Sequence, residues 1–161
     1  MTVAPLVRIE DLPKLLAPEA RLLGLDLGTK TIGLALSDVT RSIATPYHTV
    51  RRTKFTADAS QLQQTIEKNQ VGALVIGLPI NLDGSEGPRA QSTRAFARNL
   101  VALVAVPITF WDERLSTAAV ERHLIEADAS RKRRAEVIDR MAAAYILQGA
   151  LDRLRNLQAQ T

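Results

Sequence analysis

Apolar and polar residues alternate most regularly in residues 22–38, which read LLGLDLGTKTIGLALSD. At the two-residue period of a β-strand, one face of this stretch is wholly aliphatic, and the other carries small residues and Asp26. Gly28, Thr29 and Lys30 separate the two halves, which predicts a hairpin whose turn requires the conformational freedom of glycine. A carboxylate on the small-residue face of a core hairpin needs a cation or hydrogen-bond donors as partners. Asp26 is therefore the first candidate functional residue.

Beyond the hairpin, the pattern predicts strands and helices that largely alternate. The run VGALVIGLPI is continuously apolar, which is typical of a strand covered on both faces. Pro88 suits the first turn of a helix that would direct Phe96, Leu100, Leu103 and Val104 inward. The other expected elements are a short helix near residues 12–16, a third strand at 47–51, a helix at 57–69, the apolar strand at 71–80, a strand at 106–111, a helix capped by Ser116 or Thr117, and a last helix at 134–157.

This order of elements indicates the α/β fold class. Helices that connect apolar strands imply parallel pairing in a mixed sheet that is covered by helices on both faces. A chain of 161 residues is long enough to bury a core as one domain. We place that domain at residues 21–157, after a polar lead-in at residues 1–20.

Composition narrows the class of partner. Lys and Arg outnumber Asp and Glu by 21 to 17, and the cations are clustered, with RKRR at residues 131–134 and a second group at Arg51, Arg52 and Lys54. Such clusters favour a polyanion such as nucleic acid, although a single run is more often a solvated surface loop. No apolar run approaches the ~20 residues of a membrane span, and the N-terminus does not resemble a secretory signal. We expect a cytoplasmic protein with no membrane partner.

A second candidate carboxylate lies in the last predicted helix. Positions three, four and seven residues after Asp139 share its face and are Ala142, Ala143 and Ile146, so Asp139 belongs to an apolar stripe. A carboxylate in such a stripe is costly unless it is compensated. The alanines allow this helix to approach the small-residue face of the hairpin, which would bring Asp139 towards Asp26. Taken alone, an Asp at this position more often caps a helix or pairs with an arginine.

The third candidate lies in WDERLST, residues 111–117. Asp112 and Glu113 end a predicted strand and point to opposite faces, so the period leaves open which of them faces the site. Two acids before a helix are also favoured by the helix dipole. Three carboxylates that converge from separate elements require a cation. Because cysteine is absent and histidine is rare, oxygen ligands select a hard ion, Mg²⁺ or Mn²⁺, which commonly serves phosphoryl chemistry.

Four segments together resemble a known family. GLDLGTKTIGLALSD, VIGLPINLDG, DERLST and VIDRMAAAYILQ occur in this order in the YqgF family, whose members are called pre-16S rRNA nucleases and Holliday junction resolvase-like proteins. The resemblance covers residues 21–155 and implies a ribonuclease H-like fold, with a mixed five-stranded sheet of three antiparallel strands followed by parallel ones. It also implies a cytoplasmic, divalent-metal-dependent endonuclease that processes the 5′ end of precursor 16S rRNA in ribosome biogenesis.

By motif, the resemblance assigns Asp26, Glu113 and Asp139 as catalytic acids and as ligands of Mg²⁺ or Mn²⁺, and it favours Glu113 over Asp112. The related bacterial Holliday junction resolvases use four acids, whereas only three are well placed in this chain. Asp38, at the end of the second strand, is a distant candidate for the fourth. Precursor rRNA is therefore the preferred substrate, and branched DNA is the alternative.

The remaining expectations concern binding. Arg114 is expected to hold the scissile phosphate or, equally, to pair with Asp112 or Glu121. Ribosomal particles are a further expected partner of a monomer or homodimer. Rival hypotheses are an ATP-binding module, because DLGTKT also resembles the phosphate loop of actin-like ATPases, and a non-catalytic nucleic-acid-binding or transcription-associated protein. The expected nucleic-acid contacts are Thr29, Lys30, Asn81, Arg114, Arg131, Lys132, Arg133 and Arg134.

Overall fold

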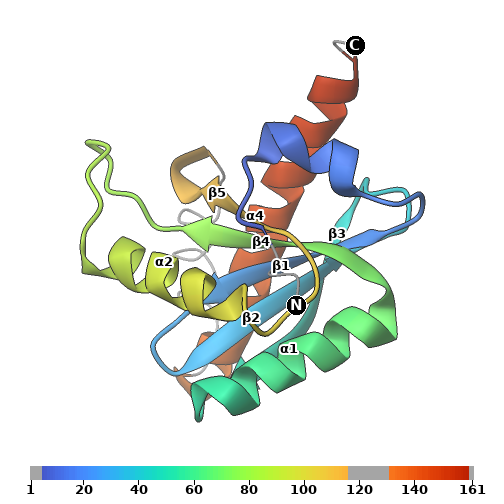
Figure 1. The fold of residues 1–161 in the computed structure, drawn as a ribbon. Coiled ribbons are helices and arrows are strands. Elements are labelled where there is room, and N and C mark those ends of the chain that lie inside the picture. The colour runs from blue at the N-terminus through green and yellow to red at the C-terminus, as the bar shows by residue number, and fades with distance from the viewer. Residues whose placement is uncertain (1–4, 116–130, 160–161) are drawn as a thin grey trace.

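The computed structural model describes residues 5–115 and 131–159, with the side chains of the last helix described from Arg140 onwards. Within these residues a mixed sheet has five strands in the order β3-β2-β1-β4-β5 (Figure 1). β1, β2 and β3 pair in antiparallel fashion, and β4 is parallel to both β1 and β5, which confirms the expected topology. The strands are β1 (Arg21–Leu27), β2 (Thr31–Ser37), β3 (Ala44–Arg51), β4 (Val71–Leu78) and β5 (Ile108–Asp112).

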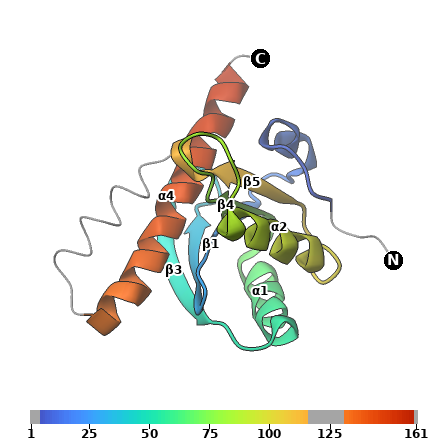
Figure 2. The same cartoon turned by 90° about the vertical axis from the view of Figure 1, so that its left-hand side faces the viewer.

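Helices cover both faces of this sheet, as Figures 1 and 2 show. α1 (Phe55–Asn69) and α2 (Pro88–Leu100) lie against one face, and the long helix α4 (Arg131–Ala159) crosses the other. The protein therefore has the expected α/β architecture. The helix expected to begin at Ser116 or Thr117 lies outside the described residues. In the part of the chain that is described, no helix combines the length and the apolar character needed to cross a membrane.

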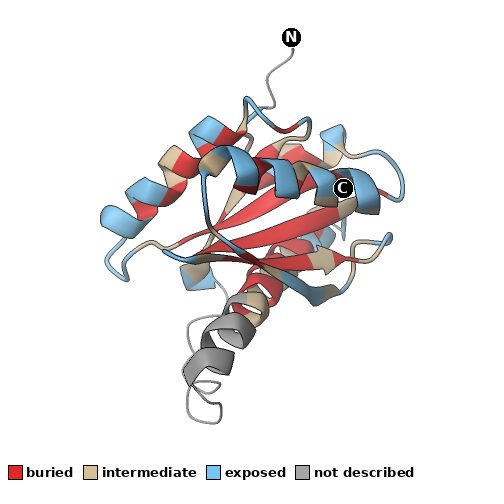
Figure 3. Ribbon diagram, turned by 90° about the horizontal axis from the view of Figure 1, so that it is seen from below, coloured by how far each residue is buried: buried red, intermediate tan, exposed pale blue. Residues whose placement is uncertain are grey.

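The hairpin of β1 and β2 forms as its alternation predicts. Its aliphatic face packs beneath α1 and α2, where Leu25 and Leu34 are fully buried together with Leu62 and Leu100 of those helices. Figure 3 shows the buried strands in red between helices whose outer surfaces are exposed. Burial of each such leucine stabilises the fold by about 1.5–3 kcal/mol relative to exposure.

The opposite face of the hairpin allows α4 to approach closely. A Cβ atom on Gly24 would lie 2.8 Å from the Cβ of Leu147 and 3.0 Å from the carbonyl oxygen of Ala143, so no larger residue fits at position 24 without a shift. Ala142 and Ile146 are also buried, as the helical period predicts. Small residues on both elements therefore fix α4 against β1.

Three local details depart from the expected pattern. Gly84 is the one glycine of the described residues with a positive φ, so the hairpin loop does not use a left-handed glycine at Gly28. That loop closes through a hydrogen bond from the Gly28 amide to the carbonyl oxygen of Thr31, at 2.8 Å. α2 ends at Leu100, and Leu103 is consequently 46% exposed instead of facing inward. α4 begins at Arg131, three residues before the expected start at Arg134, and the basic run opens the helix as expected.

The segment before β1 contributes to the core on the α4 side. The expected short helix is a 3-10 helix, η1 (Ile9–Leu15), whose Ile9 and Leu12 are buried beside α4 residues such as Leu154. Just before it, Leu6 pairs in parallel with Ile108 of β5. This pairing covers part of the outer edge of β5 and so reduces the number of backbone N–H and C=O groups that an edge strand leaves without a hydrogen-bond partner.

Candidate functional site

Asp26 lies near the carboxyl end of β1 and points to the face covered by α4. Its side chain belongs to the same face as Gly24, two residues earlier, and the residue is only 2% exposed. The register pairs Asp26 with Gly33 of β2, and the parallel pairing of β1 with β4 places Gly77 on its other side, one residue beyond the Leu25–Ile76 pair. Both neighbouring positions are thus glycine, and the room that the missing side chain of Gly77 leaves is filled by Glu113 and Ile146.

Glu113 reaches this space from the end of β5. It opens a short 3-10 helix, η2 (Glu113–Leu115), and its Oε1 lies 2.8 Å from the position of a Cβ atom on Gly77. Neighbouring strands are about 4.8 Å apart, so Glu113 Oε1 lies within about 8 Å of the Cβ of Asp26. Two carboxylates from distant parts of the sequence are thus brought to one end of the sheet, beneath α4.

The third predicted acid, Asp139, is described only as part of the backbone of α4. Its position is one helical turn before Ala143, whose carbonyl oxygen approaches the Gly24 position of β1. The helix therefore passes over the strand that carries Asp26. Within the described side chains, no group of three His, Cys, Asp or Glu residues is placed to hold a metal ion.

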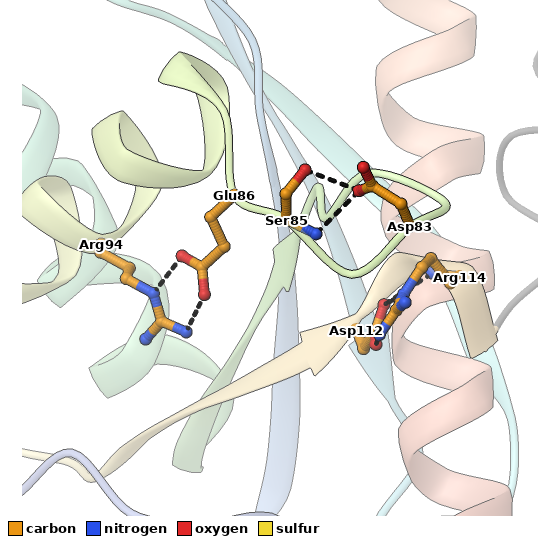
Figure 4. Close-up of polar contacts among 6 residues, drawn as sticks. All are labelled: Asp83, Ser85, Glu86, Arg94, Asp112 and Arg114. Atoms are coloured by element: carbon orange, nitrogen blue, oxygen red, sulfur yellow. Dashed lines mark hydrogen bonds and ion pairs between the residues drawn. The ribbon is translucent and has the colours of Figure 1, made fainter.

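Asp112, the neighbour of Glu113, is engaged elsewhere. Its carboxylate accepts hydrogen bonds from Nη2 of Arg114 at 2.7 Å and from the Arg114 amide at 2.9 Å (Figure 4). The Arg114 guanidinium holds the pKa of Asp112 below its usual range, and Asp112 raises the pKa of Arg114 in return. The structure thus places Glu113 beside Gly77 and pairs Asp112 with Arg114, one of the two partners expected for that arginine.

The loop between β4 and α2 is shaped by its own hydrogen bonds. The amide and hydroxyl of Ser85 donate to Oδ1 of Asp83 at 2.9 and 2.6 Å, which lowers the pKa of Asp83 (Figure 4). The side-chain amide of Asn81 donates to the Ser85 hydroxyl at 3.0 Å, and Glu86 forms a two-bond ion pair with Arg94. A loop held in this way offers a fixed wall for a ligand.

A cavity of about 290 Å³ lies between this loop, the start of α2 and the end of β5. Three of the predicted site residues line it, namely Asn81, Glu113 and Arg114. Thr29 and Lys30 are exposed on the hairpin loop, and Thr29 lines a second cavity beside the first turn of α2. The side chains of Arg131, Lys132, Arg133 and Arg134 are not among the described ones.

Arg89 lines both cavities and is not among the residues that the sequence predicted for the site. A single arginine in the first turn of a helix carries no local pattern that distinguishes it from a solvated surface residue. Its place becomes apparent only when α2 is set against the hairpin loop.

Asp38 does not join the site. The register of β1 with β2 places residue 38 at the opposite end of the sheet from Asp26. Its carboxylate accepts hydrogen bonds from the Thr40 hydroxyl and from the amides of Ser42 and Ile43, the latter two at 2.7 and 3.0 Å. These donors hold the pKa of Asp38 far below its usual range, which is the environment of a structural turn.

Comparison with solved structures places this fold in the ribonuclease H-like class. Thermus thermophilus RuvC in complex with a Holliday junction substrate matches with a TM-score of 0.56 at 14% identity, over 86% of this chain and 97% of that one. The yeast mitochondrial Holliday junction resolvase Ydc2 matches with a TM-score of 0.53 at 12% identity, over 94% and 86% of the two chains. At these identities the likeness concerns the fold alone.

Sequence comparison is more specific. The family model RuvX, described as a Holliday junction resolvase, matches residues 20–153. A relative from Methylocella silvestris is 62% identical over 156 residues, 97% of each chain, and one from Paramagnetospirillum magneticum is 64% identical over 148 residues, 92% of this chain and 96% of the relative. Both carry the name "Putative pre-16S rRNA nuclease". The chain therefore belongs to the RuvX family, which is the YqgF family that its four motifs resemble.

Proposed function

We propose that this protein is a divalent-metal-dependent endonuclease that hydrolyses phosphodiester bonds, with the 5′ end of precursor 16S rRNA as its substrate. The observation that carries the proposal is the placement of Asp26 and Glu113 on the same face of the sheet, on either side of Gly77. Family membership supports the same class of activity, because its relatives are named as nucleases. A substrate of this kind belongs to the cytoplasm, where ribosomal particles would be partners.

The donor set at this place fits a hard cation. Asp26 and Glu113 supply carboxylate oxygens, and the absence of a side chain at Gly77 lets Glu113 reach this place. We propose Asp139, on the helix that crosses this face, as the third ligand of Mg²⁺ or Mn²⁺. When bound, such an ion acidifies a water molecule as the nucleophile and offsets the charge of the leaving oxygen.

The protein's own residues would fix the substrate around these acids. Asn81 and Arg114 line the cavity that contains Glu113, so they are placed to contact the sugar–phosphate backbone. Asp112 holds Arg114 in one orientation by accepting hydrogen bonds from its Nε and Nη2, which fixes the guanidinium before substrate arrives. Thr29 and Lys30 lie on the neighbouring hairpin loop, where they extend the same contact surface.

Branched DNA is the second candidate substrate, because the matching family model is described as a Holliday junction resolvase. An assay with purified protein can decide which of the two candidate substrates is cleaved. Labelled precursor 16S rRNA and a labelled four-way DNA junction are incubated with Mn²⁺, with Mg²⁺ or with a chelator. We expect cleavage of the RNA near its mature 5′ end, only with metal, and none by Asp26→Asn.

Each other outcome assigns a different function. Preferential cleavage of the junction at symmetric positions would replace RNA processing with resolution of branched DNA. Binding of both substrates with cleavage of neither would favour the non-catalytic hypothesis. Undiminished cleavage by Asp26→Asn would remove the carboxylate site from the mechanism. Because asparagine has nearly the same shape as aspartate, circular dichroism and thermal unfolding should show that this variant remains folded.

A further inference from the structure

A second cavity, of about 500 Å³, lies on the opposite side of the hairpin loop from the acids. It is formed by the end of β1, the segment after β3 and the first turns of α2. Pro88 and Arg89 line both this cavity and the smaller one that contains Glu113, so the two cavities adjoin at the start of α2. We call the larger one the Arg52–Arg89 pocket. Its lining residues that matter here are Thr29, Arg52, Arg89, Thr93 and Phe96.

Two arginines that line this pocket are each held at the end of β1. Nη1 of Arg52 donates to the carbonyl oxygen of Gly28 at 2.6 Å, and Nη2 of Arg89 lies 3.4 Å from the carbonyl oxygen of Leu27. Because these carbonyl groups belong to consecutive residues, both cations are held at the same end of β1. Among the described residues, neither arginine forms an ion pair with a carboxylate. Two like charges thus line the same cavity at one end of β1.

Arg52 is also positioned by aromatic packing. Its Cζ lies 5.4 Å from the centre of the Phe96 ring, which is the geometry of a cation–π contact. Phe96 is 5% exposed and meets Phe55 edge to face, with ring centres 5.4 Å apart. A guanidinium held by a carbonyl group and an aromatic face loses little further freedom when it binds an anion.

We propose that the Arg52–Arg89 pocket binds a backbone phosphate of the nucleic-acid substrate, at a nucleotide outside the cleaved bond. A guanidinium group is suited to phosphate oxygens, which it contacts through two parallel N–H bonds. The adjoining cavities let one strand extend from Glu113, past the start of α2, to this pocket. The inference rests on the proposed function for the polymeric nature of the ligand, and it assigns Arg52 and Arg89 as phosphate-binding residues.

The first experiment measures binding without cleavage, using the full chain with a chelator and labelled single-stranded RNA and DNA. Arg89→Ala should weaken binding about five- to tenfold and lower the slope of log affinity against log salt by roughly one. Arg52→Lys should weaken binding several-fold, because lysine keeps the charge but loses the planar contacts. The control is Arg98→Ala, which removes the same charge at the exposed far end of α2 and should change affinity less than twofold.

The second experiment locates the contact. Oligonucleotides that carry one neutral methylphosphonate at a time are bound by the wild type, by Arg89→Ala and by Arg98→Ala. The wild type should bind more weakly when one particular phosphate is neutralised. The affinity of Arg89→Ala should not change when that phosphate is neutralised, whereas Arg98→Ala should show the same position dependence as the wild type. An Arg89→Ala profile identical to that of the wild type at every position would overturn the proposal.

Two further arms distinguish the sources of phosphate and the two proposals. Inorganic phosphate and ATP are titrated separately into the wild type and Arg89→Ala. If Arg89→Ala loses binding of either one but binds oligonucleotides as tightly as the wild type, the pocket is a small-molecule site and the inference is refuted. Cleavage by the wild type is measured in parallel with Mn²⁺. If Arg89→Ala becomes insensitive to neutralisation of one particular phosphate and the wild type cleaves neither substrate, the phosphate pocket is supported and the nuclease is refuted. If the wild type cleaves its substrate but Arg89→Ala shows the same sensitivity as the wild type at every phosphate, the nuclease is supported and the phosphate pocket is refuted.

Discussion

The carboxylate of Glu113 occupies space that a side chain on Gly77 would fill, with Oε1 2.8 Å from the position of a Cβ atom at residue 77. The same backbone position adjoins Asp26 across the pairing of β1 with β4. The absence of a side chain at residue 77 is therefore what allows an acid from the end of β5 to approach an acid in β1. Ile146 of α4 also contacts this position and closes the space from above.

Gly77→Ala should consequently impair catalysis more than folding. The added methyl group would displace the ends of two flexible side chains, Glu113 and Ile146, which costs about 1–3 kcal/mol of stability or less. Displacing a reacting group by about 1 Å reduces turnover on the order of 10²-fold. Urea unfolding and single-turnover cleavage measured on the same preparation separate the two effects.

Gly72→Ala is the matched control, because Gly72 lies at the other end of β4. There a Cβ atom would lie 2.7 Å from the Cβ of Ala20, a crowding similar in severity but remote from the acids. The control should lose stability while its folded fraction cleaves at the wild-type rate. Equal losses of turnover in both variants would show that crowding in β4, and not displacement of Glu113, is responsible.

The neighbouring acids Asp112 and Glu113 should respond differently to neutralisation. Glu113→Gln is expected to reduce cleavage by more than about 10²-fold, beyond the 10- to 100-fold typical of residues that merely support a metal ligand. Asp112→Asn weakens the hold on Arg114, so its effect should fall within that supporting range and appear mainly in KM. Steady-state kinetics over a range of Mn²⁺ concentrations would test this order, and the reverse order would exchange the roles of the two residues.

The basic run at the start of α4 is proposed to contact the nucleic-acid backbone. Replacing Arg131, Lys132, Arg133 and Arg134 by alanine should lower affinity and reduce the salt slope by up to about 0.7 per lost contact on single strands. Replacement of the three arginines, Arg131, Arg133 and Arg134, by lysine retains the charge of the run and should preserve most of the slope. Fluorescence anisotropy at several salt concentrations measures both quantities. An unchanged slope in the alanine variant would remove the run from the binding surface.

Asp38 should stabilise the fold in a pH-dependent manner. The Thr40 hydroxyl, followed by the amides of Ile43 and Ser42, holds the pKa of Asp38 well below its ordinary value of 3.8. A carboxyl whose pKa is lowered by folding gives its full stabilisation of the folded state at pH values above its unfolded-state pKa. This stabilisation is lost as the pH falls through the folded-state pKa. Asp38→Ala should therefore cost about 1 kcal/mol at pH 7, the scale of a lost side-chain cap.

The difference between the wild type and Asp38→Ala should narrow once the pH falls below about 4, the ordinary range for an aspartate. Thermal unfolding of both proteins between pH 7 and pH 2.5 provides the measurement. The stability of Asp38→Asn, which keeps one acceptor oxygen without the charge, should lie between those of the wild type and Asp38→Ala at pH 7. A gap that is constant with pH would assign the whole effect to neutral hydrogen bonds.

The sequence by itself determined the elements and their faces wherever one period governs a segment. Leu25 and Leu34 face one layer and Asp26 the other, because a strand alternates its side chains regardless of its surroundings. Leu62 and Ile146 are buried for the corresponding reason in helices. The residues at which helices end were harder to predict from the sequence, because a helix ends where its packing ends. Leu103, expected to face inward from a helix, is exposed for this reason.

Tertiary structure alone decided which residues meet. The period of β5 could not choose between Asp112 and Glu113, because the choice depends on the 3-10 turn after the strand and on the bare backbone of Gly77 in β4. Likewise, no local pattern brings Arg52 and Arg89 together, since one follows β3 and the other begins α2. Contacts between segments distant in sequence depend on the register and spacing of the layers, which local alternation does not encode.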